Sequence, residues 1–305
     1  MQKPSIVVVG SSNTDMVIKS PYLPKPGETI LGGTFFMNAG GKGANQAVAA
    51  ARLGGNVSFI AKVGNDVFGK EAVTGFQKEG IDTAYVFTDA TQPSGVALIN
   101  VDDNGENCIV VASGANAALS TTDIDNARDK IINASIVLVQ LETPLTTVAH
   151  VAALANDYGV TIILNPAPAT KLDDALLAHI AVITPNQHEA AMLTGIEVND
   201  TASAKHAAKI LHGKGVKTVI ITLGADGALL YHNDFFTGVA SPVVKAADTT
   251  AAGDVFNGAL AVALAEGKSV QHAVAYACSA AAISVTRLGA QASAPYRNEV
   301  ANPAE

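Results

Sequence analysis

The sequence predicts an α/β protein with a three-layer α/β/α domain, in which helices cover both faces of a mostly parallel central sheet. Apolar runs of strand length alternate along the chain with segments of helical spacing, as in βαβ units. These runs are apolar throughout, so both faces of the sheet need cover. A chain of 305 residues with 49% hydrophobic and 15% charged side chains can build a sizeable core. We therefore expect one large domain, with a small appendage.

Charge and cysteine content exclude several classes of protein. The chain has 19 Lys and Arg against 27 Asp and Glu, a net charge of -8, so it offers no basic surface to a nucleic acid or an anionic membrane. Residues 6–9 form the only apolar run before Gly10, which is too short for a signal peptide or a membrane span. Cys108 and Cys278 lack the spacing of a disulfide framework or a zinc site. We expect a cytoplasmic protein.

The elements of the large domain follow in order along the chain. Strands are expected at the apolar runs 5–10, 56–64, 134–140, 160–166, 180–186 and 217–224. Helices are expected at 44–53, 69–78, 143–158, 189–194, 201–213, 253–265 and 270–286. Their high alanine content permits close packing on a sheet.

Two segments break this alternation and predict a small antiparallel sheet. Residues 16–18 pair with 29–37, and residues 95–101 pair with 107–111, without intervening helices. Asn104-Gly105 predicts a two-residue hairpin between the second pair, because both residues accept positive φ. The sheet would form a lid over the ends of the parallel strands. The expected domains are 13–38 and 94–111 for the lid, and 1–12, 39–93 and 112–305 for the α/β domain.

A glycine-rich turn precedes the first helix, in NAGGKGANQ. Gly40, Gly41 and Gly43 permit close backbone approach to a ligand at the helix start. The segment is no P-loop, because Gly43 occupies the Ser/Thr position, and Gln46 breaks the dinucleotide fingerprint. A tight structural turn and a ligand loop are equally compatible with this pattern.

The segment DTTAAGDVFNG predicts an anion hole. Ala251, Ala252 and Gly253 open a long apolar helix whose unpaired N–H groups favour an anion, and Asp254 lies in the same first turn. A carboxylate there can accept a proton from an attacking hydroxyl while the amides hold a transferred phosphoryl group. A simple helix cap by Asp254 is the alternative.

Further polar residues follow the predicted strands. Ligands of open α/β sheets bind beyond the ends of the strands, and four of these polar residues lie there: Asn13, Asp15, Glu142 and Asn165. Their carboxylates and amides can bond the hydroxyls of a sugar. Turn formation by these residues is the alternative. Asn186 and Glu189 are spaced to face one hydrated Mg²⁺ at phosphate oxygens, or to form a capping box. Loop oxygens of 248–250 and 284–293 could cage a large monovalent cation, and two ordinary loops are the alternative.

Several segments together resemble the ribokinase-like (PfkB) carbohydrate kinases, in register from about residue 6 to 296. They are SSNTD, GGKGANQAVAAARLG, QLETP, LNPAPA, TPNQHEA, ITLGADGA, DTTAAGDVFNGAL and AAAISVTRLGAQ. The resemblance implies transfer of the γ-phosphoryl group of ATP to the 5-hydroxyl of D-ribose, with Mg²⁺ and an activating K⁺. It also implies homodimers formed through the lids.

The resemblance assigns roles to matching positions. The sugar would be held by Asn13, Asp15, Gly41, Lys42, Asn45 and Glu142, with Asp254 as general base and Ala251, Ala252 and Gly253 as anion hole. The nucleotide and its Mg²⁺ would be bound by Asn186, Glu189, Thr222, Gly224, Gly227, Gly253 and Cys278. The K⁺ positions would be Asp248, Thr250, Ser284, Arg287, Gly289 and Ser293, largely through backbone oxygens.

Three positions depart from the family pattern. Gln187 stands where glutamate is common, Cys278 stands where histidine is expected beside the adenine, and the anion-hole run reads AAGD instead of GAGD. A kinase for deoxyribose, a nucleoside or another furanose is the sibling alternative. A non-catalytic sugar or nucleotide sensor is disfavoured by Asp254, and an NAD-dependent oxidoreductase is disfavoured by the failed glycine fingerprint.

Overall fold

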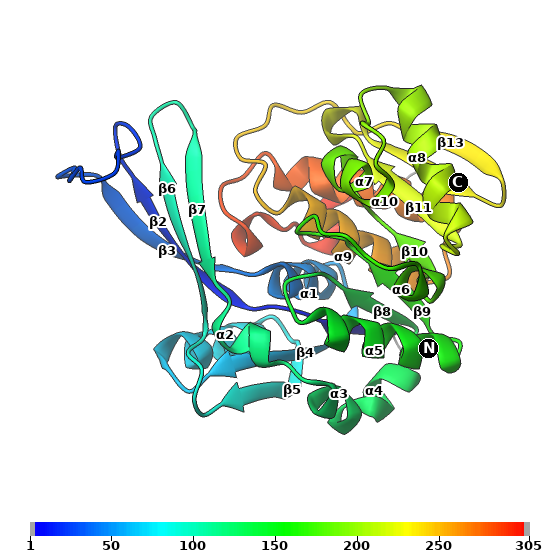
Figure 1. Cartoon of the computed structure of the whole chain (residues 1–305), viewed down its shortest axis with the longest axis horizontal. Coiled ribbons are helices and arrows are strands. Elements are labelled where there is room, and N and C mark those ends of the chain that lie inside the picture. Colours follow the sequence, from blue (N-terminus) through cyan, green and yellow to red (C-terminus); the bar gives the residue numbers. More distant parts are fainter. Residues whose placement is uncertain (1–3, 302–305) are drawn as a thin grey trace.

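A nine-stranded sheet forms the centre of the protein, as a computed structural model describing residues 4–301 shows (Figure 1). The strand order is β13-β12-β11-β10-β9-β8-β1-β4-β5, and every neighbouring pair is parallel except β11–β12 and β12–β13. The strands are β1 (Ser5–Val9), β4 (Asn56–Gly64), β5 (Asp82–Asp89), β8 (Ile136–Val139), β9 (Thr161–Leu164), β10 (Val182–Ile183), β11 (Thr218–Thr222), β12 (Ala228–His232) and β13 (Phe235–Val239). The mostly parallel sheet confirms the predicted fold class.

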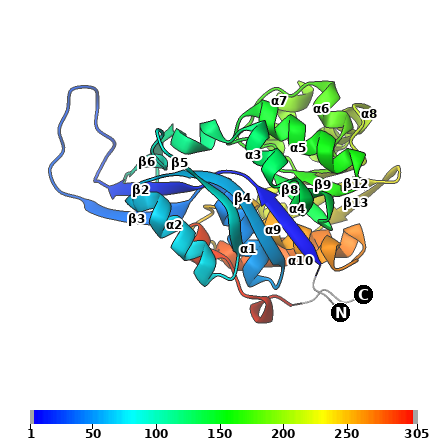
Figure 2. The same cartoon turned by 90° about the horizontal axis from the view of Figure 1, so that it is seen from below.

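Helices cover both faces of this sheet (Figure 2). One face carries α1 (Lys42–Arg52), α2 (Val67–Lys78), α9 (Ala252–Ala265) and α10 (Val270–Ser284). The other face carries α3 (Thr121–Asn126), α4 (Arg128–Ile132), α5 (Leu145–Asp157), α6 (Asp174–Ala178), α7 (Gln187–Thr194) and α8 (Thr201–Gly213). Strand β1 contributes Ile6 and Val8 to one apolar core and Val7 and Val9 to the other. The uniformly apolar strands therefore reflect burial on both sides.

A second, four-stranded sheet projects from the large one, in the order β3-β2-β6-β7 (Figures 1 and 2). Its strands are β2 (Asn13–Lys19), β3 (Thr34–Gly40), β6 (Gly95–Val101) and β7 (Asn107–Ala112). The predicted all-antiparallel pairing is wrong, because β2 and β6 pair in parallel. They follow the parallel strands β1 and β5, so both leave the large sheet in the same direction. Each then returns through its own antiparallel hairpin.

The β6–β7 hairpin is present, but its turn differs from the predicted two-residue type. Gly105 has φ 84, whereas Asn104 is not among the residues with positive φ. Gly105 N–H donates to Asp102 O at 3.0 Å, and Asp102 N–H donates to Glu106 O at 3.0 Å. The loop is therefore a type I turn followed by one left-handed glycine. The Asp102 carboxylate stabilises it by accepting bonds from the N–H groups of Asn104 and Glu106, at 2.8 and 2.9 Å.

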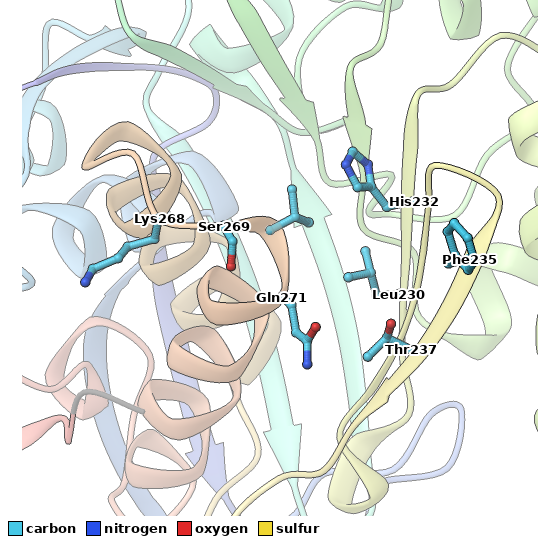
Figure 3. A pocket seen from close by; sticks show the side chains of 8 residues that line it. Leu230, His232, Phe235, Thr237, Lys268, Ser269 and Gln271 are labelled. Carbon is cyan, nitrogen blue, oxygen red and sulfur yellow. The ribbon is translucent and has the colours of Figure 1, made fainter. Parts of the chain in front are cut away.

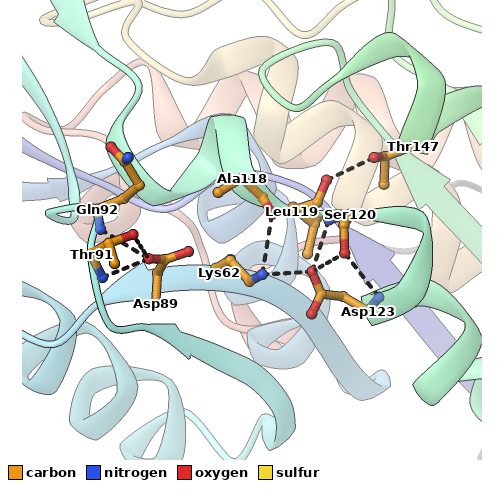
Figure 4. A network of polar contacts seen from close by, with 9 residues as sticks. All are labelled: Lys62, Asp89, Thr91, Gln92, Ala118, Leu119, Ser120, Asp123 and Thr147. Atoms are coloured by element: carbon orange, nitrogen blue, oxygen red, sulfur yellow. Dashed lines mark hydrogen bonds and ion pairs between the residues drawn. The ribbon is translucent and has the colours of Figure 1, made fainter.

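Polar contacts fix the segments that join the two sheets (Figure 4). Lys62 of β4 donates to Ala118 O at 3.1 Å and forms an ion pair with Asp123 at 2.7 Å. This pair holds the short helix η1 (Gly114–Ala118) and the start of α3, which follow β7. At the β5–β6 connection, Asp89 accepts three hydrogen bonds from Thr91 and Gln92. The small sheet therefore rests on an ordered base.

All six predicted strands of the large sheet are present, and three further strands were not predicted. β5 is a half-buried edge strand without a long apolar run. β12 and β13 form a hairpin whose turn residues, Asn233 and Asp234, both have positive φ, at 50 and 65. The expected strand at 29–37 begins only at Thr34. The ends of the predicted domain ranges, 1–3 and 302–305, lie outside the described residues. Within residues 4–301 no helix has the length and apolar character to traverse a lipid bilayer.

Candidate active site

Four charged residues meet where the parallel strands end. Asp15 comes from β2, Lys42 from the first turn of α1, Glu142 from the segment after β8, and Asp254 from the first turn of α9. Each of these groups influences the pKa of at least one other. Segments more than 200 residues apart in the sequence therefore build one polar centre, at the edge where ligands bind in such sheets.

The glycine-rich turn brings α1 against the junction of β1 and β2. Gly41 has φ 87, and a Cβ on it would lie 2.7 Å from the Asn13 nitrogen. A Cβ on Gly43 would lie 2.6 Å from the Ser11 nitrogen, and one on Gly40 would lie 2.3 Å from the Asp15 carboxylate. The three glycines are therefore needed for close packing of the chain on itself, and this packing places the start of α1 beside Asp15.

Glu142 and Lys42 link α1 to the strand ends. The Glu142 carboxylate accepts hydrogen bonds from Ser11 Oγ at 2.5 Å and from the Lys42 N–H at 3.0 Å. Burial acts to lower the pKa of the Lys42 ammonium, but Asp254 and Glu142 outweigh it and raise that pKa above its ordinary value. Lys42 is therefore a permanent cation within a group of carboxylates.

Asp15 and Asn13 lie on the small sheet, beside this centre. Burial, together with the charges of Glu142 and Asp254, raises the pKa of the Asp15 carboxyl to about 6. Asn13 is buried, and its carbonyl oxygen accepts a 2.7 Å hydrogen bond from Asn116. Asn116 in turn accepts from the Ser12 N–H at 2.9 Å, so the base of β2 is held in place.

Asp254 is buried and 5% exposed. Asn45 Nδ2 donates to one oxygen of its carboxylate at 2.9 Å, and Gln46 Nε2 donates to the other at 2.9 Å. Burial raises the pKa of the Asp254 carboxyl, while Lys42 and the two amide donors act in the opposite direction. These donors favour the ionised form, which is the form a general base requires.

The start of α9 presents unpaired backbone donors. Ala251 has φ 60 and ψ 12, and no side chain caps the helix. The Ala252 N–H donates weakly to Thr249 O at 3.3 Å, whereas the N–H groups of Gly253 and Asp254 have no acceptor within residues 4–301. Both donors adjoin the Asp254 carboxylate. An anionic group can therefore be held directly beside a proton acceptor.

Asn186 and Glu189 form the capping box that the sequence left as an alternative. Asn186 Oδ1 accepts from the Glu189 N–H at 2.8 Å, and Glu189 Oε2 accepts from the Asn186 N–H at 2.8 Å. Glu189 is buried, which raises the pKa of its carboxyl. Thr222 bridges to Asn186 from the neighbouring strand. Gly224 and Gly227 follow with φ 61 and 92, so three of the predicted nucleotide residues line one turn next to this cap.

The two predicted cation loops lie against each other. Asp248 accepts from the N–H groups of Thr250 and Gly289, both at 2.9 Å, and Ala247 N–H donates to Val285 O at 2.7 Å. The Arg287 side chain forms an ion pair with Glu299, so it takes no part in a cage. The hydroxyls of Ser284 and Ser293 are buried and donate to carbonyls of their own segments.

Two predicted residues lie away from the polar centre. Asn165 is buried behind it, where its carbonyl oxygen accepts from Gln46 at 3.0 Å. Cys278 belongs to the apolar core on α10, and burial raises the pKa of its thiol to about 11. No group of three or more His, Cys, Asp or Glu side chains able to hold a metal occurs within residues 4–301.

A pocket between the β12–β13 hairpin and the start of α10 is unrelated to this centre (Figure 3). It is lined by Leu230, His232, Phe235, Thr237, Lys268, Ser269, Val270 and Gln271. His232 pairs with Thr218 at the beginning of β11, so the pocket lies at the opposite ends of the parallel strands.

Gln46, Gln140 and Asn116 contact site residues but were not singled out from the sequence. Gln46 was seen only as a break in the dinucleotide fingerprint. A signal was available, because a glutamine in an otherwise small and apolar helix segment, AVAAA, needs buried partners.

A model of the pfkB family of carbohydrate kinases matches residues 3–297. The chain belongs to this family. A ribokinase of Haemophilus influenzae is 48% identical to it over 295 residues, covering 97% of this chain and 96% of that protein. A deoxyribokinase of Salmonella typhimurium is 38% identical over 291 residues, covering 95% of each. The solved structure of an Arabidopsis thaliana ribokinase complexed with ribose and ATP has a TM-score of 0.90 and 34% identity, and the match covers 98% of this chain and 97% of that one.

Proposed function

We propose that this kinase phosphorylates D-ribose at O5 with ATP and produces D-ribose 5-phosphate. The observation that carries the proposal is the first turn of α9, where the Asp254 carboxylate adjoins the unpaired N–H groups of Gly253 and Asp254. A binding protein has no need of a proton acceptor at an anion site. The ribokinase of Haemophilus influenzae, which is 48% identical, supports ribose as the sugar.

Asp254 acts as the general base in this proposal. Its carboxylate accepts the proton of the sugar hydroxyl as that oxygen attacks the γ-phosphorus of ATP. The amides at the start of α9, with Ala251 and Ala252 shaping the turn, stabilise the negative charge that develops on the transferred phosphoryl group. The site holds both groups in place before the reaction, so little reorganisation accompanies the transfer.

The sugar is held by residues of three segments. Asp15 and Asn13 approach from the small sheet, Glu142 from the large sheet, and Lys42 and Asn45 from α1, where Gly41 allows close backbone approach. Asn45 Oδ1 is buried and has no hydrogen-bond partner within the described residues. It can accept a hydrogen bond from a sugar hydroxyl, which would satisfy a polar atom that is otherwise costly to bury.

The phosphates of ATP and their Mg²⁺ lie near the cap of α7 in this proposal. Glu189 is buried, and its carboxylate interacts with the charges of Lys42 and Asp254. Asn186, the cap residue of α7, forms an isolated bridge with Thr222 of β11. Mg²⁺ retains several waters, so a contact through water needs few protein ligands. Gly224, Gly227 and Gly253 would line the nucleotide, with Cys278 near its base. Mg²⁺ would neutralise phosphate charge during the transfer.

The cation loops fit a large monovalent ion such as K⁺. Asp248 joins the loops by accepting from the N–H groups of Thr250 and Gly289, so backbone of both segments lies near one carboxylate. The hydroxyls of Ser284 and Ser293 donate to carbonyls of their own segments, and the Arg287 side chain is paired with Glu299. In this proposal these residues contribute backbone carbonyl oxygens. A K⁺ there would order the loops that lead into α9.

The small sheet acts as a lid and as a dimer interface in this proposal. Register places Asp15 and Asn38 on one face, toward the polar centre, and Met16, Met37 and Leu98 on the other. The outer face exposes Ile18, Phe35, Met37, Leu98 and Val110, each by 42 to 63%. A contiguous apolar patch of this kind supports association with a second copy of the chain.

We place the enzyme in the cytoplasm, where ATP is supplied and thiols stay reduced. Cys108 and Cys278 are both free cysteines. Their sequence separation and different burial give no support for a disulfide.

Deoxyribose is the competing substrate, because a deoxyribokinase is 38% identical to this chain. Turnover on ribose, 2-deoxyribose, other pentoses, hexoses and nucleosides with ATP and Mg²⁺ tests the assignment. We expect the highest kcat/KM for ribose. A higher kcat/KM for deoxyribose would transfer the assignment to that sugar, and turnover of none of these compounds would refute the kinase proposal.

A further inference from the structure

A chain of buried hydrogen bonds runs behind Asp254. Gln46 Nε2 donates to Asp254 Oδ1 at 2.9 Å and to Asn165 Oδ1 at 3.0 Å. Asn165 Nδ2 contacts Thr184 O at 3.5 Å, and Thr184 Oγ1 donates to Asn257 Oδ1 at 2.7 Å. Asn257 Nδ2 then donates to Gly253 O at 2.8 Å. The chain therefore begins at the carboxylate of the proposed base and ends on the peptide group that precedes it.

We infer that Gln46 is a positioning residue for the phosphoryl transfer, because its amide holds the Asp254 carboxylate in one orientation and in its ionised form. The inference rests on the proposed function and extends it to a residue that does not touch the substrate. Gln46 is completely buried, and its neighbours in the hydrogen-bond chain are 6% exposed or less.

The hydrogen bonds of Gln46 fix the orientation of its side-chain amide. Both of its amide hydrogens are used, by Asp254 and Asn165. Its carbonyl oxygen accepts from Gln140 Nε2 at 2.6 Å, which fixes the orientation of the amide. Asn45 also donates to Asp254, but its own oxygen has no partner. Asn45 can therefore accept from a sugar hydroxyl, whereas the amide of Gln46 is fully used by Asp254, Asn165 and Gln140.

The electrostatic surroundings make this donor important. Asp254 faces Lys42 and the two amides from α1, Glu142 from the end of β8, Asp15 from β2 and Glu189 from α7. Burial and the three other carboxylates favour the protonated form, and the Lys42 ammonium opposes them. Loss of the Gln46 donor should therefore raise the pKa of Asp254 and reduce the fraction that can accept a proton.

The test compares Gln46→Met with wild-type enzyme and with Thr147→Val. Methionine keeps the length of the side chain and removes the donor. Thr147 is equally buried and donates one hydrogen bond to Leu119 O at 2.7 Å (Figure 4). It lies on α5, which covers the opposite face of the large sheet from α9, so its replacement controls for loss of a buried hydrogen bond. Turnover of ribose, KM for ribose and the pH profile of kcat/KM are measured for all three proteins.

We expect Gln46→Met to lower kcat about ten- to a hundredfold, the usual effect of losing a hydrogen bond to a charged group. KM for ribose should stay within about threefold of wild type, and the acid limb of kcat/KM should move to higher pH. Thr147→Val should leave the acid limb at its wild-type position. An acid limb of Gln46→Met that coincides with wild type would overturn the inference, whatever the change in kcat.

Gln46→Glu replaces Gln46→Met as the test variant if circular dichroism shows that Gln46→Met does not fold. Its carboxyl matches glutamine in size and would share one proton with Asp254, so the acid limb should again move to higher pH. An unmoved limb in this variant would equally refute the role of Gln46. Wild-type turnover separates this inference from the proposed function, because an inactive wild type refutes the function itself.

Discussion

Ala251 occupies a left-handed backbone conformation, with φ 60 and ψ 12, at the cap of α9. This conformation costs alanine about 1 kcal/mol because its Cβ crowds the backbone, whereas glycine, which has no Cβ, adopts it freely. Glycine also gains about 0.4–1 kcal/mol of entropy in the unfolded chain, so we expect Ala251→Gly to raise the free energy of unfolding by a net of about 0–0.6 kcal/mol. Urea denaturation measures this difference. Destabilisation by Ala251→Gly would show that no strain is stored at this turn.

The raised pKa of Asp15 predicts a pH-dependent stability. Its value of about 6 lies above that of an unfolded aspartate, so the charged form destabilises the folded protein. The penalty is absent below about pH 4, where both states are protonated, and is complete above about pH 6. Asp15→Asn should therefore stabilise the free enzyme above pH 6, by on the order of 1–3 kcal/mol, and have little effect at pH 4.

Thermal unfolding of wild type and Asp15→Asn between pH 4 and 8 checks this expectation. Asp226→Asn serves as a control, because Asp226 lies in the exposed turn η2 (Gly224–Asp226), away from the group of carboxylates. A stability difference that does not change with pH would contradict the raised pKa of Asp15.

Residue types at strand ends identified the charged members of the site, because a carboxylate in an apolar sequence has few structural reasons to be there. Asp15 and Glu142 were found in this way, whereas Asp254 was found in the first turn of a predicted helix, and the structure brings the three together. Asn165 was grouped with the sugar-binding candidates, but it is buried and accepts from Gln46, since a sequence cannot tell a side chain that faces a cleft from one that faces a buried glutamine. Gln46 was missed for the same reason.

At the scale of elements, apolar runs predicted every interior strand except β12, because those strands are buried on both faces. β5 and β13 escaped prediction because they are edge strands of mixed burial. The parallel pairing of β2 and β6 depends on which strands they follow in the large sheet, which is a property of topology and not of local sequence. The Asn186–Glu189 pair forms a capping box, and the same spacing suits the phosphate site that we propose.

The two cation loops give a prediction at this scale. Replacing K⁺ by Li⁺ should lower turnover, because a small, strongly hydrated ion cannot be held by carbonyl oxygens spaced for a large one. Asp248→Asn weakens the attraction for any cation and keeps one of the two oxygens that accept from the N–H groups of Thr250 and Gly289. K⁺ should also raise the thermal midpoint of wild type more than that of the variant. Equal turnover in both salts would refute the proposed cation site.

For the whole molecule, the apolar outer face of the small sheet predicts a dimer. Leu98 is 56% exposed at the centre of this face, flanked by Met16 and Val110 in the register. We expect wild type to sediment as a dimer and Leu98→Asp as a monomer, because a buried unpaired charge is strongly unfavourable. Leu31→Asp is the matched control, since Leu31 is 91% exposed and lies outside the strands. A monomeric wild type would refute the interface.

The most direct test of the account is the activity and ribose affinity of Asp254→Asn. Asparagine keeps the shape of the side chain but cannot accept the proton, so kcat should fall by roughly two to four orders of magnitude. Calorimetry should show ribose binding within a few-fold of wild type, and circular dichroism should show an unchanged fold. Turnover equal to that of wild type would contradict the assignment of Asp254 as the general base.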